Sequence, residues 1–259
     1  MAGAGLVDYV RFFTRAVLFT VIASVASAQS AHEIARQARA AAFKHSDSEK
    51  AESLINTALK QWERGQDPHD VEYARALDLA GMLSQLRKAD LETVIEPLYR
   101  EALEIFDHAG AGVTEGDSAL ALELEALALK ELGRTLDATP LRERASKIRI
   151  EIVRNLNRSA ATSTPYKMGP GIKPPPIISR REPSYTEIAR MVKVQGTVVL
   201  GLVVDTDGKP GDFRLLRSVG FGLDEQAVHD VGEWRFLPAI KDGNPVAVEV
   251  SIEVNFRLL

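Results

Sequence analysis

The chain contains 259 residues, of which 32 are Lys or Arg and 36 are Asp or Glu, so its formal net charge is −4. Its length suffices for one large or two ordinary domains, and its 45% hydrophobic and 26% charged residues are typical of soluble globular proteins. A net negative charge argues against nucleic acid as the main partner, because phosphate binding needs a basic surface. The absence of cysteine excludes disulfides, thiolate nucleophiles and cysteine-ligated zinc.

Residues 1–28 have the pattern of an export signal. Arg11 and Arg15 precede an apolar run, and Ala26-Ser27-Ala28 supplies small residues at the spacing that signal peptidase prefers. We expect cleavage after Ala28 and a location in a Gram-negative periplasm, where disulfides are permitted but not obligatory. The alternative is an uncleaved anchor in the inner membrane, although the run from 16 to 28 is shorter than the roughly 20 residues that span a bilayer.

Residues 31–157 have the composition of an all-α domain, rich in Ala, Leu, Glu, Lys and Arg. A short pattern recurs in this segment, and its leucines Leu54, Leu98 and Leu141 are separated by 44 and 43 residues. Recurrence at such a period is typical of solenoids that stack helix pairs. We therefore expect three pairs of helices, at residues 31–64, 69–108 and 115–156.

One copy of this pattern resembles a known repeat family. The segment from Glu96 to Ile105 reads EPLYREALEI and is similar to the second helix of tetratricopeptide repeats, especially the long-period kind in kinesin light chains. The other copies match less well, so an irregular helical bundle is the alternative. The resemblance implies that the repeats hold a second protein or peptide. We interpret the acidic runs on these helices as solvated faces.

Residues 158–176 contain five prolines and two glycines and predict a linker in an extended or coil conformation. Residues 177–259 follow as a second domain. Its predicted elements are a helix at 185–193, strands at 196–204 and 212–218, a helix from 223 to 234 and a last strand from 247. Asp224 is the expected N-cap of the second helix, and Gly208 supplies the positive φ of the turn between the strands. This order predicts an α+β fold with two helices on one face of a three-stranded antiparallel sheet.

The last strand alternates in polarity without a break. Such alternation indicates a half-buried strand, and a terminal strand can lie at the edge of its sheet. An edge strand has unpaired N–H and C=O groups that an extended peptide can satisfy. The residues that we predict to bind a partner in this way are Val248, Glu249, Val250, Ser251, Ile252, Glu253, Val254, Asn255 and Phe256.

Residues 185–258 contain an ordered set of motif residues. They are Tyr185, Gly196, Asp207, Gly208, Leu223, Asp224, Trp234, Phe236, Pro238, Asp242, Gly243 and Pro245. By their order and spacing, this part of the chain resembles the C-terminal domain of TonB-family proteins. The family usually has proline where this chain has Thr186.

The resemblance implies a role in TonB-dependent transport across the outer membrane. TonB couples the inner-membrane proton-motive force to outer-membrane transporters, and its last strand captures a short peptide of the partner by strand addition. The implied partner is an outer-membrane TonB-dependent receptor or another envelope protein. This chain departs from energy-transducing TonB because residues 1–31 contain no histidine and helical repeats replace the long arm. A soluble periplasmic adaptor that joins two proteins without energy transduction is therefore the alternative.

No pattern in the sequence indicates catalysis. The five histidines do not have a metal-ligand spacing, so we expect no metal, no cofactor and no enzymatic activity. Trp234 and Phe236 are expected in the core rather than on a binding surface.

Overall fold

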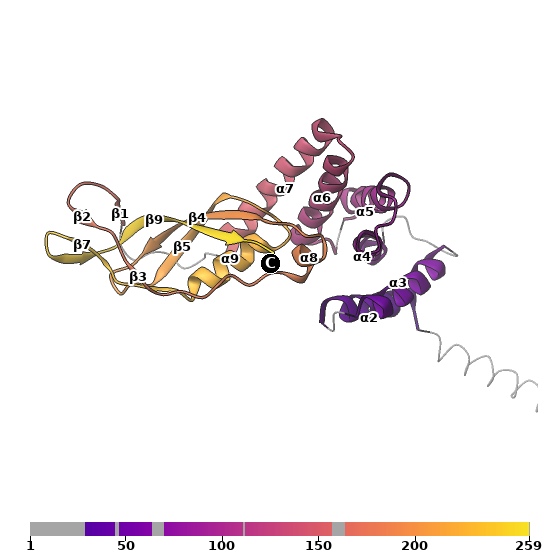
Figure 1. The fold of residues 1–259 in the computed structure, drawn as a ribbon, viewed down its shortest axis with the longest axis horizontal. Coiled ribbons are helices and arrows are strands. Elements are labelled where there is room, and N and C mark those ends of the chain that lie inside the picture. The colour runs from indigo at the N-terminus through magenta and orange to yellow at the C-terminus, as the bar shows by residue number, and fades with distance from the viewer. Residues whose placement is uncertain (1–28, 45–46, 64–69, 111, 157–163, 259) are drawn as a thin grey trace, which may run out of the picture.

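The computed structural model describes residues 29–44, 47–63, 70–110, 112–156 and 164–258. The expected export signal and the first part of the expected linker lie outside these residues. The fold is α+β, as predicted, with helices at one end of the molecule and a sheet at the other (Figure 1). Among the described helices, none combines the length and the apolar character needed to cross a bilayer.

The helical part consists of three consecutive helix pairs at the expected positions. They are α2 (Ala31–Lys44) with α3 (Ser48–Trp62), α4 (Val71–Leu86) with α5 (Glu96–His108), and α6 (Glu115–Glu131) with α7 (Thr135–Leu156). A π-helical turn, η1 (Leu91–Ile95), leads into α5. Side chains cap several helices at the N-terminus: Asp47 caps α3, Asp70 caps α4, and Thr114 forms a capping box with Asp117 on α6. Such caps satisfy backbone N–H groups that have no partner within the helix.

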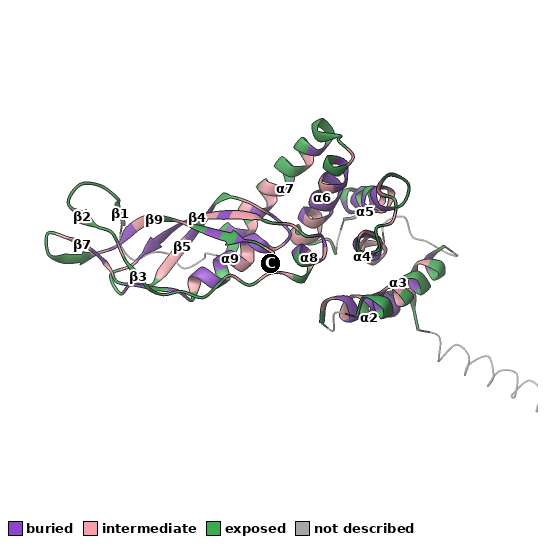
Figure 2. Ribbon diagram, viewed as in Figure 1, coloured by how far each residue is buried: buried purple, intermediate pink, exposed green. Residues whose placement is uncertain are grey.

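The sheet part is built around three antiparallel strands, as expected. The main strands are β4 (Gly196–Val204), β5 (Pro210–Arg217) and β9 (Val248–Phe256), and β4 lies between the other two. The bounds of β4 agree with the sequence prediction, whereas β9 begins one residue after the predicted start at 247 and ends at Phe256, before the C-terminus. Two helices, α8 (Glu187–Met191) and α9 (Leu223–Gly232), accompany the sheet, and α9 packs on β4 and β5. Exposed residues lie in the loop after β7, in the first turns of α7 and over most of residues 164–184 (Figure 2).

Six short strands complete this part of the molecule. They are β1 (Tyr166–Lys167), β2 (Ile172–Lys173), β3 (Ile177–Ser179), β6 (Arg235–Phe236), β7 (Ala239–Lys241) and β8 (Asn244–Val246). β1 adds a fourth strand to the main sheet, in the order β1-β9-β4-β5. β2 joins the hairpin of β7 and β8, and β3 pairs with β6. The described part of the expected linker, from residue 164, therefore pairs with the C-terminal domain at two places, Tyr166–Lys167 and Ile172–Lys173.

Two local predictions near α9 were wrong. Asp224 does not cap the helix, because the N-cap is Gly222, whose φ of 77° lies in the left-handed region. The helix also ends at Gly232, so Trp234 follows it rather than belonging to it. The expected core role of Trp234 and Phe236 is confirmed, since the two side chains are 7% and 3% exposed.

A buried ion pair joins the helical part to the sheet part. Arg149 on α7 donates from Nε and a terminal nitrogen to the two carboxylate oxygens of Glu123 on α6, each at 2.8 Å. The same carboxylate accepts the backbone N–H of Phe221 at 2.7 Å, and Arg149 also contacts Glu225 on α9. Gly220 makes room for this arrangement, because a Cβ there would lie 2.5 Å from Glu123 Oε1.

This pair corrects our interpretation of the acidic residues on the helices. Several carboxylates do not lie on solvated faces: Asp78, Glu96, Glu123 and Glu125 are all buried.

Burial alone would lower the pKa of Arg149, but hydrogen bonds and the charge of Glu123 raise it above its ordinary value. Arg149 therefore stays charged.

We predict that Arg149→Ala destabilises the protein by about 3–5 kcal/mol, because it leaves the buried Glu123 carboxylate without its counter-charge. Urea denaturation measures this change. The matched control is Arg144→Ala on the same helix, which removes an exposed pair with Asp107 and should cost less than about 1 kcal/mol. Equal effects of the two substitutions would contradict a special role for the buried pair.

A second prediction concerns Glu125 on α6. Its side chain is buried, Oε2 has no hydrogen-bond partner, and burial together with the nearby Glu96 raises its pKa to about 7. Arg100 and Arg134 oppose this shift, and Glu104 adds to it. Because the folded state holds the proton more tightly than the unfolded state, stability should fall as the pH rises from about 4.5 to about 7.

Glu125→Gln removes this titration. The variant should melt a few degrees above the wild type at pH 8, where the wild type carries a buried charge, and close to it at pH 5. Melting curves across this range provide the measurement. A difference in melting temperature that does not vary with pH would contradict the assignment.

Candidate functional site

The candidate site is the side of β9 that faces away from β4. On one side, β9 pairs with β4 along its whole length, from Val248↔Val204 to Phe256↔Gly196. On the other side, β1 covers only the beginning of β9, where Tyr166 and Lys167 pair in parallel with Val248 and Glu249. No described strand pairs with residues 250–256 on that side. The predicted edge is thus open over most, but not all, of its length.

One hydrogen bond shows which backbone groups face the open side. The N–H of Tyr166 donates to the carbonyl oxygen of Ala247 at 2.9 Å, so the backbone groups of Ala247 point away from β4. Hydrogen-bonding groups alternate in direction along a strand. Ser251, Glu253 and Asn255 therefore direct their N–H and C=O groups toward the open side.

The two faces of β9 have different environments. Val248, Val254 and Phe256 are buried, and the Phe256 ring packs edge-on against Tyr185 at 5.6 Å between centroids. The Tyr185 hydroxyl donates to the carbonyl of Val194, and burial raises the pKa of Tyr185. This contact ties the open strand to the segment before β4 and holds it in place.

The opposite face of β9 is polar and exposed. Thr197 donates to Asn255 at 2.6 Å, and Arg214 on β5 lies 3.3 Å from Glu249. Glu253 is exposed and forms no ion pair within the described residues. A peptide that approaches β9 would therefore contact the backbone groups along the edge of the strand and the polar side chains on its exposed face.

The segment that carries β1 is held at two further points. The Lys241 ammonium lies 4.2 Å from the centre of the Tyr166 ring, and Ile172 and Lys173 of β2 pair with β7. The Tyr166 side chain is nevertheless 45% exposed. β1 thus forms a short, well-anchored boundary at the start of the open edge.

The family motifs mostly build this sheet rather than line the open edge. Asp224 accepts hydrogen bonds from the Ser218 hydroxyl and from the N–H groups of Val219 and Gly220, and so closes the loop before α9. Thr186, at the position where the family has proline, caps α8 instead. Of the other motif residues, Leu223, Trp234 and Phe236 are buried, Gly196 begins β4, and Asp207, Asp242 and Gly243 lie in turns. Pro238 precedes β7, and Pro245 lies within β8.

Gly208 connects two of these motifs. It has a φ of 77° and accepts the N–H of Phe236 through its carbonyl at 3.0 Å, so the turn after β4 is bonded to β6. A Cβ at this position would lie 1.9 Å from the Phe236 carbonyl oxygen. Both the backbone conformation and the close approach therefore require glycine.

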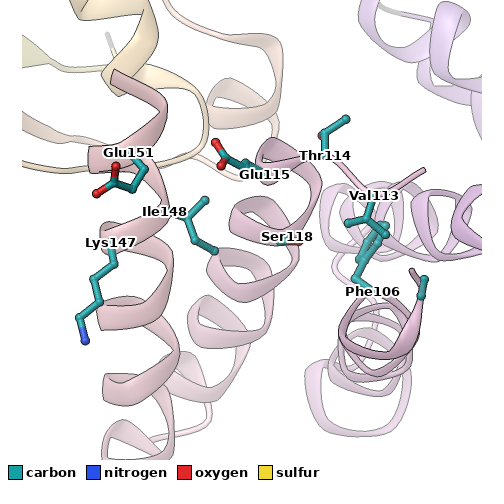
Figure 3. A pocket seen from close by; sticks show the side chains of 9 residues that line it. Phe106, Val113, Thr114, Glu115, Ser118, Lys147, Ile148 and Glu151 are labelled. Atoms are coloured by element: carbon teal, nitrogen blue, oxygen red, sulfur yellow. The ribbon is translucent and has the colours of Figure 1, made fainter. Parts of the chain in front are cut away.

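Two concave surfaces were not predicted from the sequence. A cleft of about 870 Å³ lies between the helical part and the end of the sheet, and a groove of about 420 Å³ lies among α5, α6 and α7. In the groove, Phe106 and Val113 lie on one side and Ile148, Lys147 and Glu151 on the other (Figure 3). Within the described residues, no three His, Asp or Glu side chains are placed to bind a metal ion.

The geometry defines a small α+β domain with one open sheet edge, and comparison with known proteins finds a family with this kind of domain. Residues 181–258 match the family described as Gram-negative bacterial TonB protein C-terminal, so this part of the chain resembles a TonB C-terminal domain. Protein TonB from Vibrio cholerae serotype O1 is 36% identical over 87 residues, which are 33% of this chain and 36% of that protein. The chain thus matches only about a third of the length of this curated relative.

Two solved structures are similar to parts of the chain. The solution structure of the Pseudomonas aeruginosa TonB CTD has 23% sequence identity and a TM-score of 0.29, covering 37% of this chain and 96% of its own. The crystal structure of BtubC (BKLC) from P. vanneervenii has 20% identity and a TM-score of 0.41, covering 52% of this chain and 54% of its own.

We predict that Gly208→Ala destabilises the domain by at least about 1–2 kcal/mol, the cost of the left-handed conformation alone, with the clash against Phe236 in addition. Gly211→Ala is the matched control, because no atom lies within 4 Å of its added Cβ. Urea denaturation of both variants measures the difference. A stable Gly208→Ala variant would show that the turn does not need this contact.

Proposed function

We propose that the protein acts as a TonB-like component of the cell envelope, in which the C-terminal domain captures an extended peptide by strand addition to β9. The observation that supports this proposal is the open side of β9 from residue 250 to 256. The partner would be the periplasmic peptide of an outer-membrane TonB-dependent receptor or of another envelope protein. The role is binding in support of transport, in the periplasm or at the inner membrane, and not catalysis.

The edge has the properties that strand addition requires. Ser251, Glu253 and Asn255 each offer one donor and one acceptor, so a peptide can gain hydrogen bonds without depending on particular side chains. β1 already occupies the side facing Val248 and Glu249, so a peptide that leaves β1 in place would pair with residues 250–256. The exposed carboxylate of Glu253 would favour a peptide without acidic residues at the facing positions.

A periplasmic adaptor is the second candidate function, and the interface between the two parts favours it. In a long-armed transducer the peptide-binding domain is distant from the rest of the chain. Here the helical part packs directly on the sheet part through Arg149, Glu123 and Phe221. A chain whose two parts pack together in this way is suited to holding one protein on its helices and another on β9.

The test is proline substitution on the open side of β9. Ser251→Pro and Glu253→Pro each remove an N–H that points away from β4, so the sheet should survive while peptide capture is lost. Binding is measured by isothermal titration with periplasmic peptides of outer-membrane receptors. We expect at least a tenfold loss of affinity for each proline variant.

The matched control is Glu253→Ala, which keeps the backbone N–H and should bind with nearly unchanged affinity. Circular dichroism verifies that each variant is folded. Unchanged peptide binding by a folded proline variant would exclude strand addition at this edge.

A further inference from the structure

A cleft between the helical part and the sheet has no role in the function proposed above. Its volume is about 870 Å³, within the usual range of ligand-binding sites. One wall consists of residues on α6 and α7, together with Gln85 of α4. The other wall consists of residues 192–197, before and at the start of β4, and residues 215–221, at the end of β5 and in the loop that follows.

The wall at the end of β5 has an irregular strand. Arg217 pairs with Val199 and Leu215 pairs with Leu200, so Leu216 is an extra residue in a β-bulge. Its side chain lines the cleft and is 58% exposed. Ile150 and Val219 add half-buried apolar surface to the same cleft. The cleft therefore offers contacts for apolar side chains.

The charged side chains of the cleft are mostly basic. Lys130, Arg142, Lys193 and Arg217 line it, against Glu131 and Glu143 at its surface. The other lining carboxylate, Glu123, is neutralised by Arg149. Lys130, Arg142 and Lys193 form no ion pair within the described residues, although the chain as a whole carries a net charge of −4.

The walls of the cleft are held in a defined position. Glu123 and Phe221 both line it, and the hydrogen bond between them joins the helical wall to the sheet wall. The basic side chains thus project from two parts of the chain that are fixed relative to each other. A preformed site loses less conformational entropy on binding than a flexible one.

From these observations we propose that the cleft binds a short acidic peptide whose apolar side chains contact Leu216 and Ile150. Its carboxylates pair with Lys130, Arg142 and Lys193. This site is distinct from the open side of β9, because no residue of β9 lines the cleft, and β5 and β9 lie on opposite sides of β4. The proposal therefore does not depend on strand addition.

The test uses the full chain and a fluorescein-labelled ten-residue peptide that alternates glutamate and valine. Fluorescence anisotropy measures its affinity. The double variant Arg142→Glu/Lys193→Glu should bind at least tenfold more weakly, since it replaces two attractive charges by two repulsive ones. The control Lys147→Glu/Lys173→Glu has the same change in net charge at residues outside the cleft and should bind like the wild type.

Three outcomes would overturn the proposal: no binding of the acidic peptide, equal loss in both double variants, or equally tight binding of a lysine-valine peptide or single-stranded DNA. A second measurement locates the peptide. Because the chain has no cysteine, Ser146→Cys places a single fluorophore in the cleft, and Lys147→Cys places one beside it. The peptide should change the emission at position 146 only, and a change at 147 alone would also exclude the cleft.

Discussion

The buried pair of Arg149 and Glu123 determines how the two parts of this protein are arranged. Placing two charges in the interior costs several kcal/mol per ion, and only good geometry with further hydrogen bonds offsets this cost. Glu123 obtains two bonds from Arg149 and one from the N–H of Phe221, and Arg149 also reaches Glu225. These groups come from α6, α7 and the start of α9. All of their hydrogen bonds can therefore form together only when the helices and the sheet have one particular relative position.

In that arrangement, the two edges of the sheet have different surroundings. α7 packs near β5, so the helical part lies against one side of the sheet. β9 lies on the other side of β4, where β1 covers only Val248 and Glu249. Exposed edges promote aggregation unless they are short, charged or covered. Here one edge borders a cleft, and the other is shortened by β1 and carries Glu253 on its exposed face.

The sequence predicted the elements whose signals are local. Unbroken alternation identified β9, although the strand ends at Phe256 and not at the C-terminus, and the Asp-Gly turn identified the hairpin of β4 and β5. The short strand β1 was not predicted from the sequence. A strand of two residues shows no polarity pattern, and its partner β9 lies far along the chain. Asp224 was misassigned because a carboxylate at a helix start can cap its own helix or accept from the preceding loop. The burial and pairing of Glu123 and Arg149 were not predicted, because each residue, considered alone in the sequence, looks like an ordinary solvent-exposed charge.

The arrangement also bears on how force would pass through the molecule if the protein acts as a transducer. A load on the helical part would reach the sheet through the buried pair, the Phe221 hydrogen bond and the apolar core that the two parts share. It would then cross from β4 to β9 through a ladder from Val204↔Val248 to Gly196↔Phe256. A peptide on the open side of β9 would lie next to that ladder, so the best-bonded strand pair would carry the load. The same rigid connection would serve an adaptor, because it keeps two bound partners at a constant separation. The structural elements that support capture are therefore common to both functions, and the segment that precedes the helices is what would distinguish them.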